Sequence, residues 1–177
     1  MWNPDLYQKA IAFAGYAHRN QLVPGKDYNY IVHVSSVAAE VAGAICAEKI
    51  GDEDLAIQCA LLHDVIEDSD FGPEILGQEF GEKVLKGVLA LTKDETLPRE
   101  RRLDDSLARI LGEGREIACV KMADRITNLQ RPPGHWTREK REAYLAEARA
   151  IHRALGGSSA ILGRRLEEKI EEYAMYL

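Results

Sequence analysis

The sequence predicts an all-α fold: a single helical bundle of about nine helices, with one domain over residues 1–177. Apolar residues recur at helical spacing along nearly the whole chain, and no window alternates apolar and polar residues long enough for a strand. With 46% hydrophobic and 29% charged residues among 177, the chain can build a sizeable core. The predicted helices cover residues 4–20, 34–50, 52–68, 73–80, 82–92, 97–111, 115–130, 137–155 and 158–176.

Local signals set the boundaries of the first helices. Asn3 is placed to cap a helix whose first position is Pro4, where the missing N–H costs nothing. Residues 21–30 contain Pro24 and Gly25 and are predicted to form a loop. Glycines separate the helices that follow, at positions 51, 72 and 81. The later helices are predicted from the periodic spacing of their apolar residues. The 115–130 helix is apolar around most of its circumference, which predicts that it is buried.

Charge and composition limit the function. The formal net charge of −6 argues against nucleic-acid binding, which needs a basic surface. We find no signal peptide and no apolar run of membrane-spanning length, so no membrane partner is expected. The three cysteines, 46, 59 and 119, lie in apolar helical sequence without metal-site spacing. They predict buried free thiols and a cytoplasmic protein.

Four acid/base side chains lie within six residues: His63, Asp64, Glu67 and Asp68. On one continuous helix they share an arc that is small and apolar in its preceding turns. This pattern is typical of a helix that presents ligands at the bottom of a pocket. The alternative is a fraying last turn with solvated charges, but carboxylates there oppose the helix dipole, and a bound cation relieves that conflict.

Two distant segments can complete this cluster. His33 precedes one apolar helix, and Asp124 and Asn128 share a narrow polar arc with Lys121 and Arg125 on another. Imidazoles with carboxylates form a mixed nitrogen and oxygen set that suits a divalent transition metal. A lone histidine is as often a cap or a packed core residue, and a polar arc is often a solvent-facing stripe. The combination favours a metal site.

The order His33, His63–Asp64, Asp124 resembles the HD-domain metal-dependent phosphohydrolases. Six blocks together resemble the hydrolase domain of the RelA/SpoT enzymes and the stand-alone small alarmone hydrolases. These blocks are residues 15–21, 30–33, 60–68, 80–81, 91–93 and 121–128, and the similarity extends from about residue 5 to about residue 155.

The ligand set predicts hydrolysis. His33, His63, Asp64 and Asp124 are expected to hold one divalent ion, which stabilises charge on a phosphate and activates water. Glu67 and Asp68 lie one turn beyond the His-Asp pair, where they can orient or deprotonate the water and assist the leaving group. The resemblance implies the same assignment, with manganese as the ion.

The resemblance also implies a substrate, guanosine with a 3′-diphosphate and a 5′-di- or triphosphate, which is cleaved to pyrophosphate and GDP or GTP. It places Asn128 near the ribose or the 3′ side and Tyr144 near the base or sugar. Lys140, in the segment that begins at Trp136, can counter the phosphates, although a helical lysine is more often simply solvated.

One departure from the family concerns the base. Val23 occupies the position of an arginine that meets the base in the family, and only Lys26 can substitute for it. Two alternatives follow: an HD phosphohydrolase for another phosphorylated nucleotide, or a metal-bound sensor without turnover. Because a sensor has no need of Glu67 and Asp68, their presence favours an enzyme.

Overall fold

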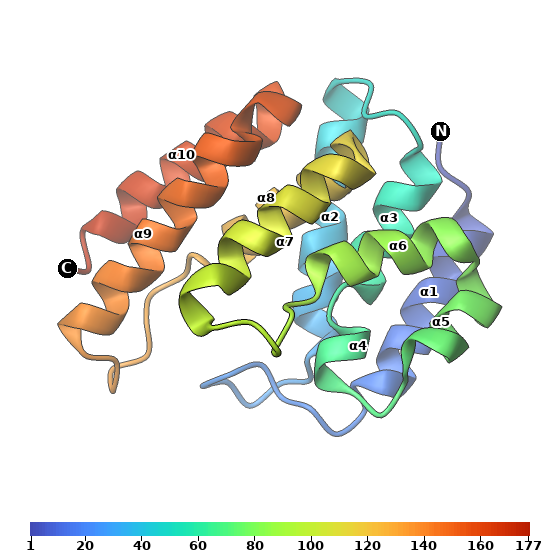
Figure 1. Cartoon of the computed structure of the whole chain (residues 1–177), viewed down its shortest axis with the longest axis horizontal. Coiled ribbons are helices and arrows are strands. Elements are labelled where there is room, and N and C mark those ends of the chain that lie inside the picture. Colours follow the sequence, from blue (N-terminus) through green and yellow to red (C-terminus); the bar gives the residue numbers. More distant parts are fainter.

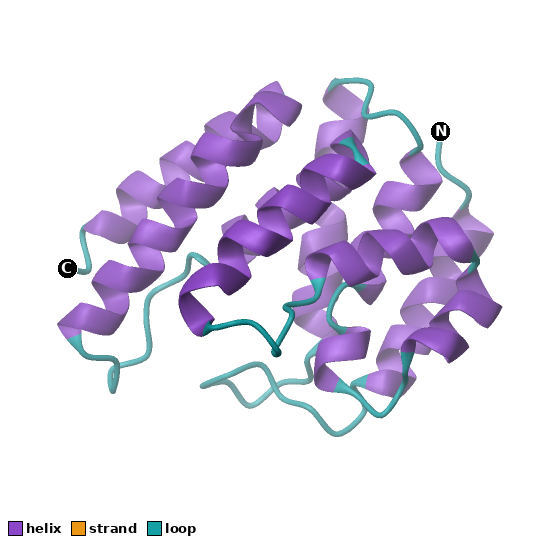
Figure 2. Ribbon diagram, in the orientation of Figure 1, coloured by secondary structure: helices purple, strands orange, loops and turns teal.

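The computed structural model describes residues 1–177 and confirms the all-α prediction (Figures 1 and 2). It contains ten α-helices and one 3-10 helix, with no strand beyond an isolated bridge between Leu22 and Asn29. The helices are α1 (Pro4–Ala17), α2 (Ile31–Ala47), α3 (Glu53–Leu62), α4 (Val65–Asp68), α5 (Pro73–Phe80), α6 (Glu82–Leu91), α7 (Arg99–Glu113), α8 (Arg115–Asn128), α9 (Arg138–Leu155), η1 (Gly156–Ser158) and α10 (Ala160–Ala174).

The difference from nine helices lies at the His-Asp pair. The segment predicted as one helix over residues 52–68 divides into α3 and α4, with His63 and Asp64 between them. Another boundary also moves: α2 begins at Ile31, so His33 lies in its first turn instead of preceding it. Both shifts concern residues of the predicted metal site.

Side-chain caps and glycines fix the other boundaries. The Asn3 side chain accepts a hydrogen bond from the Asp5 amide at 2.9 Å, as its predicted capping role requires. Thr137 caps α9 in the same way through the Lys140 amide. Gly81 and Gly114 join consecutive helices at φ 83° and 109°, a region that L-residues rarely adopt.

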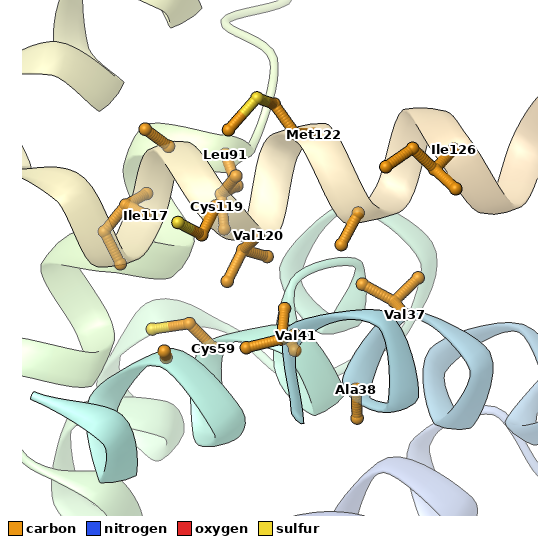
Figure 3. Close-up of a cluster of buried hydrophobic side chains, with 14 of the residues drawn as sticks. Val37, Ala38, Val41, Cys59, Leu91, Ile117, Cys119, Val120, Met122 and Ile126 are labelled. Atoms are coloured by element: carbon orange, nitrogen blue, oxygen red, sulfur yellow. The ribbon is translucent and has the colours of Figure 1, made fainter. Parts of the chain in front are cut away.

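Helix α8 lies at the centre of the bundle and contacts α2, α3, α7, α9 and α10. Figure 3 shows Val120 of α8 facing Val41 of α2 and Cys59 of α3. The buried apolar side chains form one cluster of 39 residues from Ala10 to Tyr173. Such a core holds the carboxyl-terminal end of α8 rigidly beside α2 and the α3–α4 junction.

The cysteine prediction is wrong at one position. Cys59 and Cys119 are buried, but Cys46 is exposed because the last turn of α2 carries it into solvent. All three are free thiols. None of the helices combines the length and hydrophobicity that crossing a bilayer requires.

Candidate active site

The four predicted metal ligands converge from three parts of the chain. His33 comes from α2, His63 and Asp64 from the α3–α4 junction, and Asp124 from α8. The His63 Nε2 atom lies 3.0 Å from Asp64 Oδ2 and 3.7 Å from Asp124 Oδ1. His33 Nε2 lies 3.7 Å and 3.5 Å from the same two oxygens. Ligand atoms of His33, His63 and Asp64 all lie within 4.8 Å of one another.

These residues fit a divalent ion. Donors about 2.1 Å from a common ion lie roughly 3.0–3.5 Å apart at octahedral or tetrahedral angles, close to the separations observed. The Nε2 atoms of His33 and His63 are buried and have no hydrogen-bond partner. The Nδ1 atom of His63 lies 2.9 Å from the Ala60 carbonyl oxygen. With Nδ1–H donating to that carbonyl, Nε2 presents its lone pair to an ion.

The charges in the cluster stabilise one another. Burial opposes ionisation, but in the metal-free protein the Asp64 and Asp124 carboxylates outweigh it and raise the pKa of His63 well above its ordinary value, so a cation that binds here has to displace the Nε2 proton. Burial likewise opposes ionisation of Asp124, and the Lys121 ammonium, with the histidines, holds the pKa of that carboxyl well below its usual range. Burial also opposes ionisation of Asp64, but His63 lowers the pKa of that carboxyl, so both aspartates are carboxylates at neutral pH and can serve as oxygen ligands.

The break between α3 and α4 gives the His-Asp pair its geometry. On a continuous helix, adjacent side chains point about 100° apart, whereas here Asp64 Oδ2 approaches His63 Nε2. Asp64 caps α4 in place of continuing α3, and its carbonyl accepts the Asp68 amide at 2.8 Å. The prediction of one continuous ligand-bearing arc is therefore wrong, although the pair does face the same centre.

Sequence reasoning missed a partner of Asp64. The Tyr30 hydroxyl donates to Asp64 Oδ2 at 2.6 Å, and its ring packs against His33 with centroids 4.9 Å apart. Burial, followed by the nearby Asp64 carboxylate, raises the pKa of Tyr30, so the hydroxyl keeps its proton and remains a donor. The only sequence signal was the place of Tyr30 one helical turn before His33.

The polar side chains of α8 contact two different sets of partners. Lys121 Nζ lies 3.1 Å from Asp124 Oδ2, and Asn128 Nδ2 donates to Asp124 Oδ1 at 2.6 Å. Arg125 points elsewhere: it is buried, its guanidinium lies 4.3 Å from the centroid of the Tyr144 ring, and it pairs with Glu147 at 3.2 Å. Arg125 therefore joins α8 to α9 and does not share the arc predicted for it.

Glu67 and Asp68 lie outside the ligand cluster, and each has its own anchor. Lys93 holds Glu67 at two points, with Nζ 2.7 Å from Oε1 and the backbone amide 3.2 Å from Oε2. Gln21 Nε2 donates to Asp68 Oδ2 at 3.0 Å. The two predicted catalytic carboxylates are thus fixed by different segments of the chain.

A cavity of about 670 Å³ opens beside the ligand cluster and includes His33 in its wall. Three of the four predicted substrate contacts, Lys26, Asn128 and Tyr144, line it. Lys140 does not, because its ammonium lies over the Trp136 ring, 4.3 Å from the centroid. The remaining lining residues come mainly from the 23–36 and 127–136 segments and are Val23, Pro24, Gly25, Tyr28, Val32, Ser36, Thr127, Gln130, Arg131, Pro132, Pro133, Trp136 and Tyr173.

The helical bundle and its clustered histidines and aspartates define an HD-domain, metal-dependent hydrolase. The chain belongs to the HD-domain family, whose sequence profile matches residues 10–161. It is 29% identical over 167 residues to the guanosine-3′,5′-bis(diphosphate) 3′-pyrophosphohydrolase MESH1 of Drosophila melanogaster, covering 92% of this chain and 91% of that protein. The Homo sapiens MESH1 is 30% identical over 171 residues, with 92% and 89% covered.

A solved structure of a related protein has the same fold. A metazoan orthologue of SpoT that hydrolyses ppGpp and plays a role in starvation responses superimposes with a TM-score of 0.84 at 27% identity. The match covers 100% of this chain and 99% of that one. These similarities confirm the resemblance to the RelA/SpoT-type hydrolases.

Proposed function

We propose that the protein hydrolyses the 3′-pyrophosphate of guanosine tetra- and pentaphosphate, releasing pyrophosphate and leaving GDP or GTP. One observation carries the proposal: the ligand cluster adjoins a nucleotide-sized cavity. The cluster consists of His33, His63, Asp64 and Asp124, and the relatives of the chain are named for this reaction. A divalent ion bound there, which we propose to be manganese, supplies charge stabilisation at the reacting phosphorus and lowers the pKa of water.

The chain's own residues account for the rest of the reaction. Water attacks the phosphorus attached to the ribose 3′ oxygen, the 3′ O–P bond breaks, and the 3′ oxygen receives a proton. We assign removal of the proton from the water to Glu67, which Lys93 fixes, and orientation of the water or assistance to the leaving group to Asp68, which Gln21 contacts. Both roles follow from their place one turn beyond the His-Asp pair.

The cavity supports nucleotide binding away from the reacting bond. The rings of Tyr144 and Trp136 line the cavity with centroids 5.3 Å apart, and Val23, Pro132 and Pro133 add apolar surface for a base. Asn128, which also contacts Asp124, lies where the cavity meets the ligand cluster and can donate to the ribose or the 3′ group. Lys26 supplies a cation at the cavity wall.

A nucleotide panel tests this function. The manganese-loaded protein is incubated with ppGpp, pppGpp, a nucleoside monophosphate and a deoxynucleoside triphosphate, and pyrophosphate and phosphate are measured separately. We expect pyrophosphate in equal amount to GDP or GTP from the first two substrates only, and none from the Asp64→Ala variant. Inorganic phosphate as the first product, or cleavage of the other nucleotides alone, would assign the chain to a different HD phosphohydrolase.

A further inference from the structure

His18 is a buried polar side chain that the proposed chemistry does not use. It follows the last turn of α1 and is only 1% exposed. Its Nδ1 atom lies 2.6 Å from Gln21 Oε1, and its Nε2 atom is buried with no partner. Burial of an imidazole is unfavourable unless its polar atoms are satisfied. The hydrogen bond to Gln21 is therefore the one polar interaction of the His18 side chain, and an apolar residue at this position could not make it.

Gln21 joins this buried histidine to Asp68. Its side-chain Nε2 donates to Asp68 Oδ2 at 3.0 Å, across 47 residues of sequence. Its backbone is also fixed, because the Gln21 amide donates to the His18 carbonyl at 3.0 Å and the Gln21 carbonyl accepts the Tyr30 amide at 2.9 Å. The side chain thus extends from a backbone position that two hydrogen bonds hold between α1 and α4, at the end of the bundle where both helices lie (Figure 1).

The orientation of the Gln21 amide decides whether it can hold Asp68. A carboxylate accepts hydrogen bonds and cannot donate them, so the NH2 group must face Asp68. If the amide turned over, its oxygen would face Oδ2 at the same short distance and repel it. The Nδ1–H group of His18 prevents this, because it requires the amide oxygen on its own side.

Asp68 depends on this contact. It is exposed at the end of the one-turn helix α4, and Gln21 is the only protein group that hydrogen-bonds its carboxylate. Without that donor an exposed aspartate is free to rotate among its rotamers. Glu67, in contrast, is held by Lys93, so loss of Gln21 disturbs one carboxylate of the pair and not the other.

We propose that His18 and Gln21 are positioning residues that fix the Asp68 carboxylate for hydrolysis, with His18 setting the orientation of the Gln21 amide. The inference rests on the proposed function, in which Asp68 serves the water or the leaving group. It assigns a role in turnover to two residues that lie outside the metal cluster and outside the cavity wall.

Gln21→Glu is the informative variant. It preserves size and still accepts from His18 Nδ1, so the base of the 21–30 loop is kept, but it sets a second carboxylate against Asp68. We expect kcat to fall about 10- to 100-fold while KM stays within about twofold, because Asp68 acts in the reaction and not in nucleotide binding. Gln8→Glu, an exposed site on α1 with the same change of charge, is the control and should behave as wild type.

A double-mutant cycle separates positioning from folding. His18→Phe keeps a ring against Tyr30, 5.0 Å away between centroids, but lacks the Nδ1–H donor. It should lower kcat in the wild-type background and have no further effect once Asp68 is changed to Ala. Additive losses, or a KM that rises as much as kcat falls, would show that His18 only supports the loop that lines the cavity and would overturn the proposal.

A measurement without substrate completes the test. In a long-range 1H–15N spectrum, His18, assigned through the signal that His18→Phe removes, should carry its proton on Nδ1. A proton on Nε2 alone would mean that the Gln21 amide has the opposite orientation, and this result would overturn the proposal. If the wild-type protein releases no pyrophosphate, the proposed function fails, while this spectrum still decides whether Gln21 can donate to Asp68.

Discussion

Replacing Tyr30 by Phe removes one hydroxyl from the metal site and leaves its ring in place. The ring is 9% exposed and packs between His18 and His33, so the fold should tolerate the change. The lost interaction is the 2.6 Å hydrogen bond to Asp64 Oδ2. A hydrogen bond to a charged acceptor contributes about 1.5–3 kcal/mol.

The usual effect of ligand orientation on metal affinity gives a free-energy change of similar size. Loss of a group that orients a metal ligand typically weakens metal affinity about 10- to 100-fold, or about 1.4–2.7 kcal/mol. Both estimates assume that Asp64 is a ligand whose orientation Tyr30 fixes. We therefore expect the Mn²⁺ dissociation constant of Tyr30→Phe to rise by one to two powers of ten, roughly the range of those estimates.

Calorimetric titration of the metal-free protein with Mn²⁺ measures this change. Tyr173→Phe is a matched control, since Tyr173 is buried and its hydroxyl has no hydrogen-bond partner. It should bind Mn²⁺ as wild type does. An unchanged dissociation constant in Tyr30→Phe would refute the reasoning, because it would mean that Asp64 either does not bind the ion or is oriented without Tyr30.

Three further predictions follow from the site. Asp64→Ala should lose bound manganese and all turnover, and it should be less stable because the partners of Asp64 remain buried; unaltered metal content by elemental analysis would contradict the ligand assignment. Glu67→Gln should retain the metal and lose turnover by a factor on the order of 10²–10⁴; near-normal rates would move the catalytic role to Asp68. Because Val23 cannot donate hydrogen bonds to a base, the adenosine analogue should be cleaved within roughly tenfold of the guanosine compound, and Lys26→Ala should weaken both; a guanine preference of about a hundredfold would show that another residue selects the base.

Local sequence patterns were enough for most of the helices, whereas joining His33 and Asp124 to the His63–Asp64 pair depended on the residue types and on the resemblance to the HD-domain enzymes. Helical periodicity and the cap at Asn3 act within one turn, so they can be recognised without tertiary information. The break between α3 and α4 could not be predicted from periodicity. No glycine or proline marks it, and the apolar spacing continues through Val65.

The contacts that support the site were not predictable from the sequence pattern. Tyr30 meets Asp64 across 34 residues, and Glu67 meets Lys93 across 26. Each pair depends on how α2, α4 and the α6–α7 loop are placed together, which periodicity does not report. The contact of Lys140 was not predictable either: its ammonium lies over the ring of Trp136, while the phosphate contact suggested by its family-like segment stays a prediction.

The acidic net charge of −6 at first argues against an anionic substrate, but the field at the site is set locally. Exposed charges more than about 8–10 Å away are largely screened at physiological ionic strength. Near the reacting bond, Lys121 pairs with Asp124 and Lys93 with Glu67. A divalent ion matches the charge of the remaining two carboxylates, Asp64 and Asp68.

Lys26 and Arg131 lie in the cavity wall and form no ion pair with an acidic side chain, so they add positive charge to the wall although the protein as a whole is acidic. A divalent ion held by the ligand cluster would add to this positive charge beside the cavity, because His33 belongs to both the cluster and the cavity wall. The ion and these two cations would together attract an anionic nucleotide locally, although the chain as a whole is acidic.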